Sequence, residues 1–358
     1  MIKPRDKNLN TISEMKNGET RLIFYNYNNK NTYFFIKNNL IESFWIEEDN
    51  ELTPGNVYAA IVNKYDKASG GYFVSVSEKQ TVYIPSRNIH EVHLCNERTF
   101  DGRLYEGEQV LVQIKKSAYK DKRAQGNCKI IIPGMEDEQL SNLLEKGRHL
   151  SKYSVIYEAL SFLQEIYIEN RNTIKIVCNN KVAYNIAIKQ LVKFIDDSKL
   201  NDIVSLYSNT QISLSALYGL KSKFEELTTT KVWLKNGGYI FINPTEAMIV
   251  IDVNSGKNSG KKTVEESALD TNLNAIDEIL HHIQCRNLSG IIIIDFINQK
   301  NNESNNILIE KLKNGLSELN PPGIFIDMTK LGLVEITRKK IRSDIYENIS
   351  QFDKTILL

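Results

Sequence analysis

The chain has 358 residues, of which 41% are hydrophobic, and this length suits two or three domains with cores of their own. Its 45 lysine and arginine residues nearly balance its 44 aspartate and glutamate residues, which excludes a protein that attracts polyanions through its overall charge. The four cysteines form no C-x-x-C pair, which argues against a disulfide framework and a structural zinc site. No apolar stretch approaches the ~18 residues of a membrane span, and the N-terminus lacks a signal-peptide core. We therefore expect a cytoplasmic protein with no membrane partner.

Short strands dominate the first part of the chain. Residues 21–46 alternate apolar runs with Asn and Lys turns, which predicts a meander of two or three strands. Over residues 53–134, short strands follow one another between glycine turns, a pattern typical of a small closed barrel of the OB type. Residues 135–171 then show helical periodicity and predict a linker of one or two helices.

Strands and helices alternate over residues 172–229, which predicts part of an α/β sheet. This segment is too short for a complete doubly wound domain. We therefore expect its strands to complete a sheet with residues 1–52, so that the barrel is inserted into a discontinuous domain.

The last third, residues 230–358, predicts an α/β unit. A hairpin turns at Asn236-Gly237-Gly238, and the capping-box signature Thr263-x-x-Glu266 begins a helix over residues 264–287. The strand IIIIDF, a helix over residues 306–317 and the strand GIFIDM complete the unit.

Two aspartates in this unit are the sharpest chemical feature of the sequence. Asp252 follows AMIVI and Asp295 follows IIII, which places each at the C-terminal end of a strand, where open α/β sheets build their sites. If the two strands are neighbours, the carboxylates lie close enough to share a Mg²⁺ ion that polarises a phosphodiester, and Asn254 points the same way. From the pattern alone, the alternative is that both aspartates cap turns.

Two other motifs in this unit have less support. The loop over residues 255–263, with Lys257 among its lysines, fails the Walker A spacing because Gly256 and Gly260 differ by four positions where five are needed. It fits either a cradle for RNA phosphate or a solvated loop. A second group has helical metal-ligand spacing but no fourth ligand, so we favour a structural role for its members, His281, His282 and Cys285.

In the predicted barrel, Phe73 and Tyr83 lie on successive strands. A group of basic residues follows the last strand: Lys116, Lys120, Lys122 and Arg123. Aromatic rings beside a basic edge are how OB folds stack bases and hold single-stranded backbone. The pattern fits equally well rings that belong to the core and lysines of a solvated turn.

The motifs KVWLKNGGYIFINPTEAMIVIDVNSG, EESALDTNLNAIDEI, NLSGIIIIDFI and LGLVEITRKK resemble the catalytic domain of the ribonuclease E/G family of endoribonucleases. A weaker resemblance extends through most of the chain. It implies a multidomain α+β and α/β fold with four parts: a discontinuous ribonuclease-H-like subdomain (1–52 and 172–229), an inserted S1-like OB-fold barrel (53–134), a helical linker with a reduced sensor region (135–171), and a DNase-I-like catalytic subdomain (230–358).

The resemblance implies a Mg²⁺-dependent endoribonuclease that hydrolyses single-stranded RNA in rRNA processing or mRNA decay and leaves 5′-phosphate and 3′-hydroxyl ends. Asp252 and Asp295 match the family's metal-binding aspartates and would share one Mg²⁺ ion, and Asn254 matches the asparagine that assists at the scissile phosphate. The expected RNA-binding residues are the two barrel aromatics, two barrel lysines and one loop lysine: Phe73, Tyr83, Lys116, Lys122 and Lys257. One alternative is a non-cleaving RNA-binding protein on this scaffold; the presence of Asp252, Asn254 and Asp295, which we call the polar triad, argues against it. The other alternative is a DNA nuclease, which the predicted barrel disfavours.

The sequence departs from the family pattern in three places. The cysteine pair that shares zinc between protomers has no counterpart, so we expect no zinc and a monomer or homodimer without a zinc link. Asn320-Pro321-Pro322-Gly323 stands where the arginine of the 5′-monophosphate sensor would lie, so stimulation by a 5′-monophosphate should be weak or lost. A long C-terminal scaffold is missing, so degradosome assembly through such a tail is not expected.

Overall fold

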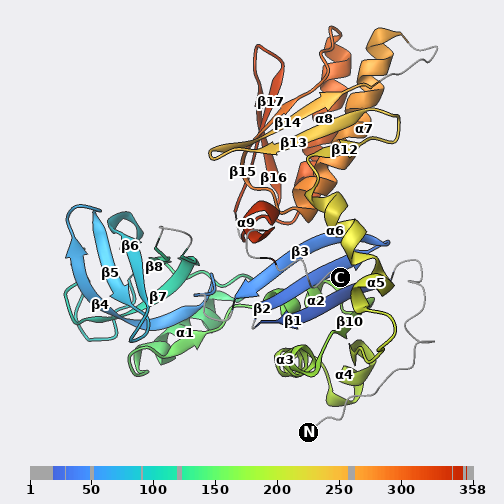
Figure 1. Ribbon diagram of the computed structural model, residues 1–358. Helices are drawn as coiled ribbons and strands as arrows, with labels where there is room; N and C mark the ends of the chain where they lie inside the picture. The colour runs from blue at the N-terminus through green and yellow to red at the C-terminus, as the bar shows by residue number, and fades with distance from the viewer. Residues whose placement is uncertain are drawn as a thin grey trace. The chain divides into compact units, whose positions relative to one another are not determined.

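The computed structural model describes residues 19–28, 30–48, 52–89, 92–118, 123–256, 263–340, 342–349 and 352 (Figure 1). The chain divides into two compact units, one formed by Met1–Glu47 with Phe162–Leu358 and the other by Glu48–Ser161. Within the described ranges, no helix combines the length and the apolar character that crossing a membrane requires.

The unit Glu48–Ser161 is built around a closed barrel. Its elements are β4 (Val57–Asp66), β5 (Gly71–Ser75), β6 (Thr81–Pro85), η2 (Ser86–Asn88), β7 (Gln109–Lys116) and β8 (Gln125–Asn127). The strands lie in the order β5-β6-β8-β7-β4, and β4 pairs again with β5, which closes the ring. The β6–β8 pairing is parallel and the others are antiparallel, an arrangement consistent with an OB-like fold. Alternate side chains such as Val74, Ile84 and Val112 fill the interior.

The segment between the barrel and residue 161 contains a strand that the helical periodicity did not predict. Helix α1 (Asp137–Arg148) is followed by β9 (Val155–Tyr157), which pairs with β4 at the edge of the barrel sheet. Helix and strand approach closely because Gly147 has no side chain: a Cβ there would lie 2.9 Å from Ile156. A strand of three residues is too short to show a two-residue period, which is why the sequence did not reveal it.

The predicted meander and residues 172–229 share one five-stranded sheet, in the order β11-β10-β1-β2-β3. Its strands are β1 (Thr20–Tyr27), β2 (Lys30–Lys37), β3 (Leu40–Glu48), β10 (Ile174–Cys178) and β11 (Val204–Leu206), and its helices are α2 (Phe162–Asn170), α3 (Lys181–Leu191), α4 (Asp197–Ile203), α5 (Leu214–Tyr218) and α6 (Leu220–Thr228). Alternate residues of β1 enter two different cores, with Leu22 and Phe24 against α2 and α3, and Ile23 against α5 and α6.

One helix predicted in this region is two helices in the structure. The apolar pattern of SALYGLKSKFEEL predicted a continuous helix, but Gly219 adopts φ +58° and ends α5 in the left-handed conformation. A left-handed residue stops the hydrogen-bond ladder of a helix, and glycine adopts this conformation at no steric cost. Helix α6 starts at the next residue.

The last sheet has six strands. In the order in which they lie side by side, these are β12 (Lys231–Trp233), β13 (Tyr239–Pro244), β14 (Met248–Asn254), β15 (Gly290–Asp295), β17 (Leu333–Arg338) and β16 (Gly323–Met328). Helices α7 (Val264–Cys285) and α8 (Asn302–Glu318) pack on one face, against alternate residues such as Ile251 and Ile294 (Figure 1). The other face therefore carries the intervening side chains.

The local signals in this unit are confirmed. The Thr263 hydroxyl accepts a hydrogen bond from the Glu266 amide, and the Glu266 carboxylate accepts one from the Thr263 amide, so the capping box begins α7 as predicted. The predicted hairpin joins β12 to β13. Helix α8 begins at Asn302, before the predicted residue 306, because the Asn301 side chain caps a polar first turn that carries no apolar period.

A buried polar network joins α7 to the short helix α9 (Ile345–Ile349). The Arg286 side chain is fully buried, and its Nε donates to His282 Nδ1 at 3.0 Å. Its other nitrogens donate to the Tyr346 hydroxyl at 2.9 Å and to the Thr229 carbonyl at 2.8 Å. His282 and Cys285 are thus buried structural side chains, as the sequence favoured.

This network predicts a pH-dependent stability. Burial, with the charge of Arg286 as a second cause, lowers the pKa of His282 to about 2. Because the unfolded chain protonates this imidazole near pH 6.5 and the folded chain does not, the free energy of unfolding should fall by about 1.4 kcal/mol between pH 7.5 and pH 5.5. Denaturant titrations of the wild type and of His282→Gln at both pH values measure this loss, and equal losses in the two proteins would contradict the assignment.

Candidate functional site

The two aspartates meet at the end of neighbouring parallel strands. Asp252 on β14 is the register partner of Asp295 on β15, so their backbones lie about 4.8 Å apart. Ile251 and Ile294, the preceding residues, face the helices, so both carboxylates are on the opposite face. Asp252 is half-buried and Asp295 is exposed. Asn254 lies on the same face and donates from Nδ2 to Asp252 Oδ2 at 2.7 Å.

Two polar side chains of α7 hold the segment that follows Asp295. Asn272, which is fully buried, donates to the Ile297 carbonyl at 2.8 Å and accepts from the Ile297 amide at 3.0 Å. Glu265 accepts from the amides of Lys300 and Asn301, both at 3.0 Å. Sequence reasoning missed these anchors, although an asparagine on the apolar face of the predicted helix was an available signal.

The hairpin turn beside Asn254 is anchored to the same helix. The Asn236 side chain donates to the Asp270 carboxylate at 3.1 Å and to the Thr271 hydroxyl at 3.3 Å. Gly238 lies against the Asn254 backbone, and a Cβ there would lie 2.8 Å from the Asn254 carbonyl oxygen. The glycine therefore allows the turn to approach the polar triad closely.

The donor set fits Mg²⁺ better than zinc. Two carboxylates on one accessible face suit Mg²⁺, which takes one or two protein carboxylates and keeps several waters. Zinc needs three or four protein ligands. Among the residues that the structure describes, no group of three or more His, Cys, Asp and Glu side chains could hold a metal. Lys257 and the other loop lysines lie outside the described residues.

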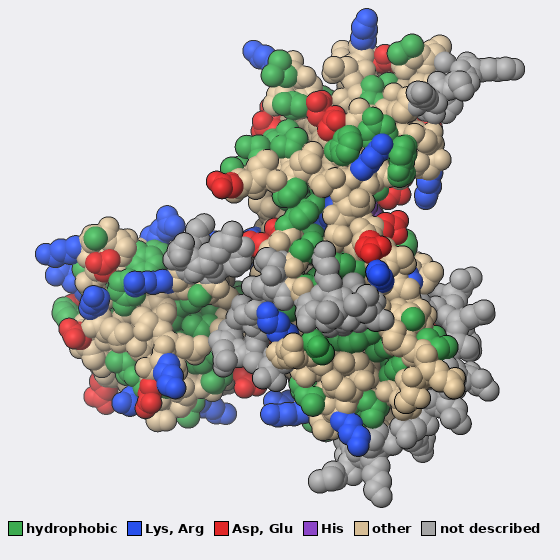
Figure 2. Space-filling view, viewed as in Figure 1, with side chains coloured by type: hydrophobic (Ala, Val, Ile, Leu, Met, Phe, Trp, Pro, Cys, Tyr) green, Lys and Arg blue, Asp and Glu red, His purple; other side chains and the backbone are tan. Residues whose placement is uncertain are grey.

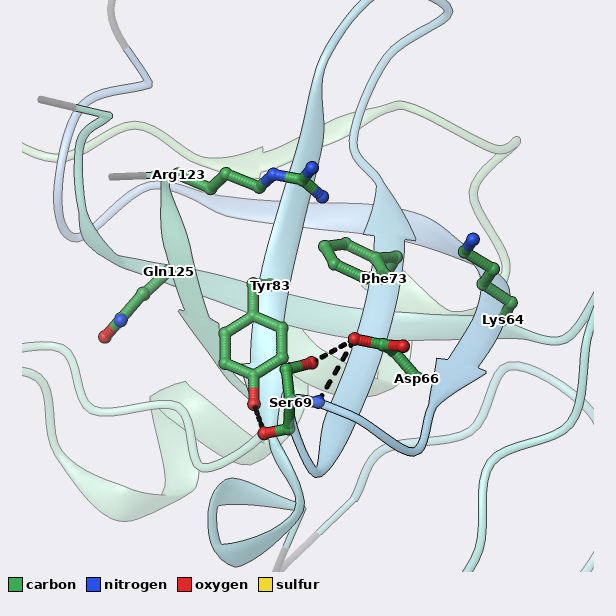
Figure 3. Close-up of a pocket in the computed structure, with 7 residues that line it drawn as sticks. All are labelled: Lys64, Asp66, Ser69, Phe73, Tyr83, Arg123 and Gln125. Atoms are coloured by element: carbon green, nitrogen blue, oxygen red, sulfur yellow. Dashed lines mark hydrogen bonds between the residues drawn. The ribbon is translucent and has the colours of Figure 1, made fainter. Parts of the chain in front are cut away.

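A second candidate site is an open pocket of about 520 Å³ on the barrel (Figure 3). Its lining residues are Lys64, Asp66, Ser69, Phe73, Tyr83, Arg123 and Gln125. Phe73 and Tyr83 are register partners on β5 and β6, and their ring centroids lie 5.7 Å apart. The Arg123 guanidinium lies 4.8 Å and the Lys64 ammonium 5.9 Å from the Phe73 ring centroid. Both rings are half-buried and stand outside the barrel core, so they are not core side chains; their role in stacking on bases stays a prediction.

A tight turn holds the pocket's second ring in place. The Tyr83 hydroxyl donates to the Ser69 carbonyl at 2.5 Å, and the Asp66 carboxylate accepts from the Ser69 hydroxyl at 2.5 Å (Figure 3). The hydrogen bond from the Ser69 hydroxyl lowers the pKa of Asp66. Lys116 is exposed at the end of β7 and does not line the pocket, and Lys122 lies outside the described residues. Lys64, from β4, was missed by sequence reasoning, although β4 and β5 form one hairpin in which Lys64 is the register partner of Phe73.

Comparison with known proteins decides the family. The model of the ribonuclease E/G family matches residues 135–341, which is more than half of the chain. The chain belongs to the ribonuclease E/G family. The resemblance inferred from the sequence is thereby confirmed, and the matched residues include the carboxylate pair but not the five barrel strands.

Relatives within this family share part of their length with the chain. Ribonuclease G of Haemophilus influenzae is 34% identical over 207 residues, which cover 57% of this chain and 41% of that protein. A ribonuclease E/G-like protein of Pyropia yezoensis is 32% identical over 235 residues, which cover 61% and 45%. Ribonuclease G of Escherichia coli K12 is 36% identical over 129 residues, which cover 36% and 26%. The chain thus spans less than half the length of these relatives.

A buried arginine holds the segment Asn320-Pro321-Pro322-Gly323 through its backbone. Arg338 donates to the carbonyl oxygens of Asn320 at 2.6 Å and Pro321 at 2.9 Å, and to that of Leu288 at 2.9 Å. The Arg338 residue is only 2% exposed. The Arg338 guanidinium therefore donates to backbone carbonyls and to the side chains of Gln284 and Asn287, and its burial keeps it from a terminal phosphate.

Proposed function

We propose that the chain is a Mg²⁺-dependent endoribonuclease that hydrolyses single-stranded RNA in rRNA processing or mRNA decay. The observation that carries the proposal is the register pairing of Asp252 with Asp295, with Asn254 bonded to Asp252 on the same accessible face. Family membership supports it, because the Haemophilus and Escherichia relatives are named ribonuclease G.

Each side chain of the polar triad has its own role in the proposed reaction. Asp252 and Asp295 would hold Mg²⁺, which when bound polarises the scissile phosphodiester and lowers the pKa of a water. Asn254 uses one N–H on Asp252 and keeps a second N–H for a phosphate oxygen. The N–H···O bond between them also keeps Asp252 in one orientation. Attack by water leaves a 5′-phosphate and a 3′-hydroxyl end.

We assign the remaining parts by the same resemblance. The barrel over residues 53–134 is an S1-like RNA-binding domain inserted in a ribonuclease-H-like subdomain (1–52 and 172–229), and residues 230–358 are a DNase-I-like catalytic subdomain. The protein acts in the cytoplasm as a monomer or homodimer without zinc. Residues 135–171 replace a larger sensor region.

The barrel pocket predicts a binding phenotype. Phe73→Ala should raise the Kd for a single-stranded RNA 12-mer at least fivefold, because stacking contributes about 1–3 kcal/mol per base. Phe73→Tyr keeps the ring and should bind within about twofold of the wild type. Fluorescence anisotropy in EDTA measures both Kd values, and circular dichroism checks the fold. An unchanged Kd, or unfolding of the alanine variant, would show that this ring does not stack on bases.

Dependence on Mg²⁺ separates the proposed enzyme from its rival. A single-stranded RNA carrying a fluorophore and a quencher should be cut in Mg²⁺, should stay intact in EDTA, and should be cut again when Mg²⁺ is restored. A non-cleaving RNA-binding protein would bind the same RNA and release no fluorescent product in any of the three conditions. Equal cleavage in Mg²⁺ and EDTA would exclude the metal.

A further inference from the structure

Three aromatic rings and a lysine lie together on the same sheet as the carboxylates. The Lys231 ammonium is 4.0 Å from the ring centroid of Trp233, 3.9 Å from that of Tyr239 and 5.9 Å from that of Phe241. Tyr239 lies 5.5 Å from each of the other two rings, centroid to centroid. We call these four residues the β12–β13 cluster. Figure 2 shows hydrophobic side chains around a basic one over this part of the sheet.

Strand register places the cluster beside the polar triad. Phe241 pairs with Asp252, and Tyr239 pairs with Asn254. Trp233 pairs with Tyr239 one strand further out. Because register partners on neighbouring strands project from the same face, the rings share the face of the carboxylates, about 5 and about 10 Å from β14.

Packing alone does not explain the outer ring of the cluster. The core of this sheet lies on the other face, against α7 and α8. Trp233 is 63% exposed, although tryptophan has more apolar surface to bury than any other side chain. A cation held against one exposed and two half-buried rings combines the two features that single-stranded nucleic acid binds, a stacking platform and a positive charge.

We propose that the β12–β13 cluster is a base-stacking subsite for single-stranded RNA next to the bond that is cut. Trp233 and Tyr239 stack on bases. Lys231 offsets the negative charge of the RNA phosphates where the strand passes toward Asp252. The inference rests on the proposed function for its substrate and adds a binding surface on a different pair of strands. An apolar protein partner would instead suit the far strand, β16, where the aliphatic side chains of Ile324 and Ile326 are 60% and 55% exposed.

Tryptophan emission tests the subsite without any need for cleavage. The chain has two tryptophans, so Trp45→Phe leaves Trp233 as the sole emitter. In an Asp295→Asn, Trp45→Phe protein in EDTA, titration with a 12-mer of adenylate should quench this emission. In a separate anisotropy titration, Trp233→Ala should raise the Kd for the same RNA at least fivefold, and Trp233→Phe should change it less than about twofold. Ile324→Ala, an exposed side chain elsewhere on the sheet, is the matched control and should leave the Kd unchanged.

Three results would overturn the subsite. Emission of Trp233 could stay constant while anisotropy shows the RNA to be bound. Trp233→Ala could leave the Kd unchanged. Sedimentation could also show that Trp233→Ala converts a dimer to a monomer with the same Kd, which would make the cluster an interface between copies. The proposed function is judged separately: cleavage that Asp295→Asn abolishes and Trp233→Ala leaves intact would uphold the enzyme and reject the subsite.

Discussion

Asp252→Asn or Asp295→Asn should each lower the rate of single-stranded RNA cleavage at least about 100-fold. Asparagine has the shape of aspartate but not its charge, so each change removes half of the negative charge available to Mg²⁺. Both side chains lie on the face of the sheet that does not pack against α7 and α8, so the core should be unaffected. RNA affinity should change little, because in the proposed function the barrel makes contacts of its own with RNA.

Single-turnover kinetics with protein in excess measure this effect. Asp327→Asn is the matched control, since Asp327 is an exposed carboxylate on β16 of the same sheet. It should cleave at the wild-type rate. Near-normal turnover in either carboxylate variant would exclude a metal site shared by Asp252 and Asp295.

Arg286→Ala should lower the free energy of unfolding by about 3 kcal/mol or more. The substitution leaves a cavity in a fully buried position and takes the donors away from the Thr229 carbonyl, the Tyr346 hydroxyl and His282 Nδ1. A buried acceptor without a donor costs about 1–3 kcal/mol. Arg286→Lys retains the charge but cannot reach three acceptors in different directions, so its loss should be intermediate.

Denaturant unfolding followed by circular dichroism gives these free energies. Arg171→Ala is the control because Arg171 is exposed, and it should change the free energy of unfolding by less than about 0.5 kcal/mol. A loss below about 1 kcal/mol in Arg286→Ala would mean that the network does not connect α7 to α9 energetically.

Local signals carried much of the fold prediction. The capping box at Thr263 and the turn after Trp233 depend on a few adjacent residues, and both are present in the structure. The break at Gly219 and the strand β9 were missed. The left-handed φ of Gly219 ends α5, and pairing with β4 makes residues 155–157 a strand. Neither feature leaves a periodic pattern in the sequence.

In the candidate site too, local features could be predicted from the sequence and the pairing of distant strands could not. Each aspartate could be placed at a strand end from its own apolar run, but their pairing depends on β14 and β15 being neighbours, which the structure establishes. The predicted hairpin turned at Asn236-Gly237-Gly238, and the structure pairs Trp233 with Tyr239 across it. That these rings share a face with Asp252 follows only from the pairing of β13 with β14. The roles of the predicted site residues stay predictions until the variants are measured.

The ends of the RNA products test the central claim most directly. A single-stranded RNA 12-mer is incubated with the wild-type protein in Mg²⁺, and the products are weighed by mass spectrometry. Water-mediated cleavage at the Asp252–Asp295 pair predicts internal cuts whose products carry a 5′-phosphate and a 3′-hydroxyl. Products that end in a 2′,3′-cyclic phosphate with a 5′-hydroxyl partner would show that the ribose hydroxyl attacks instead of water, and this result, or uncut RNA that the protein nonetheless binds, would contradict the account.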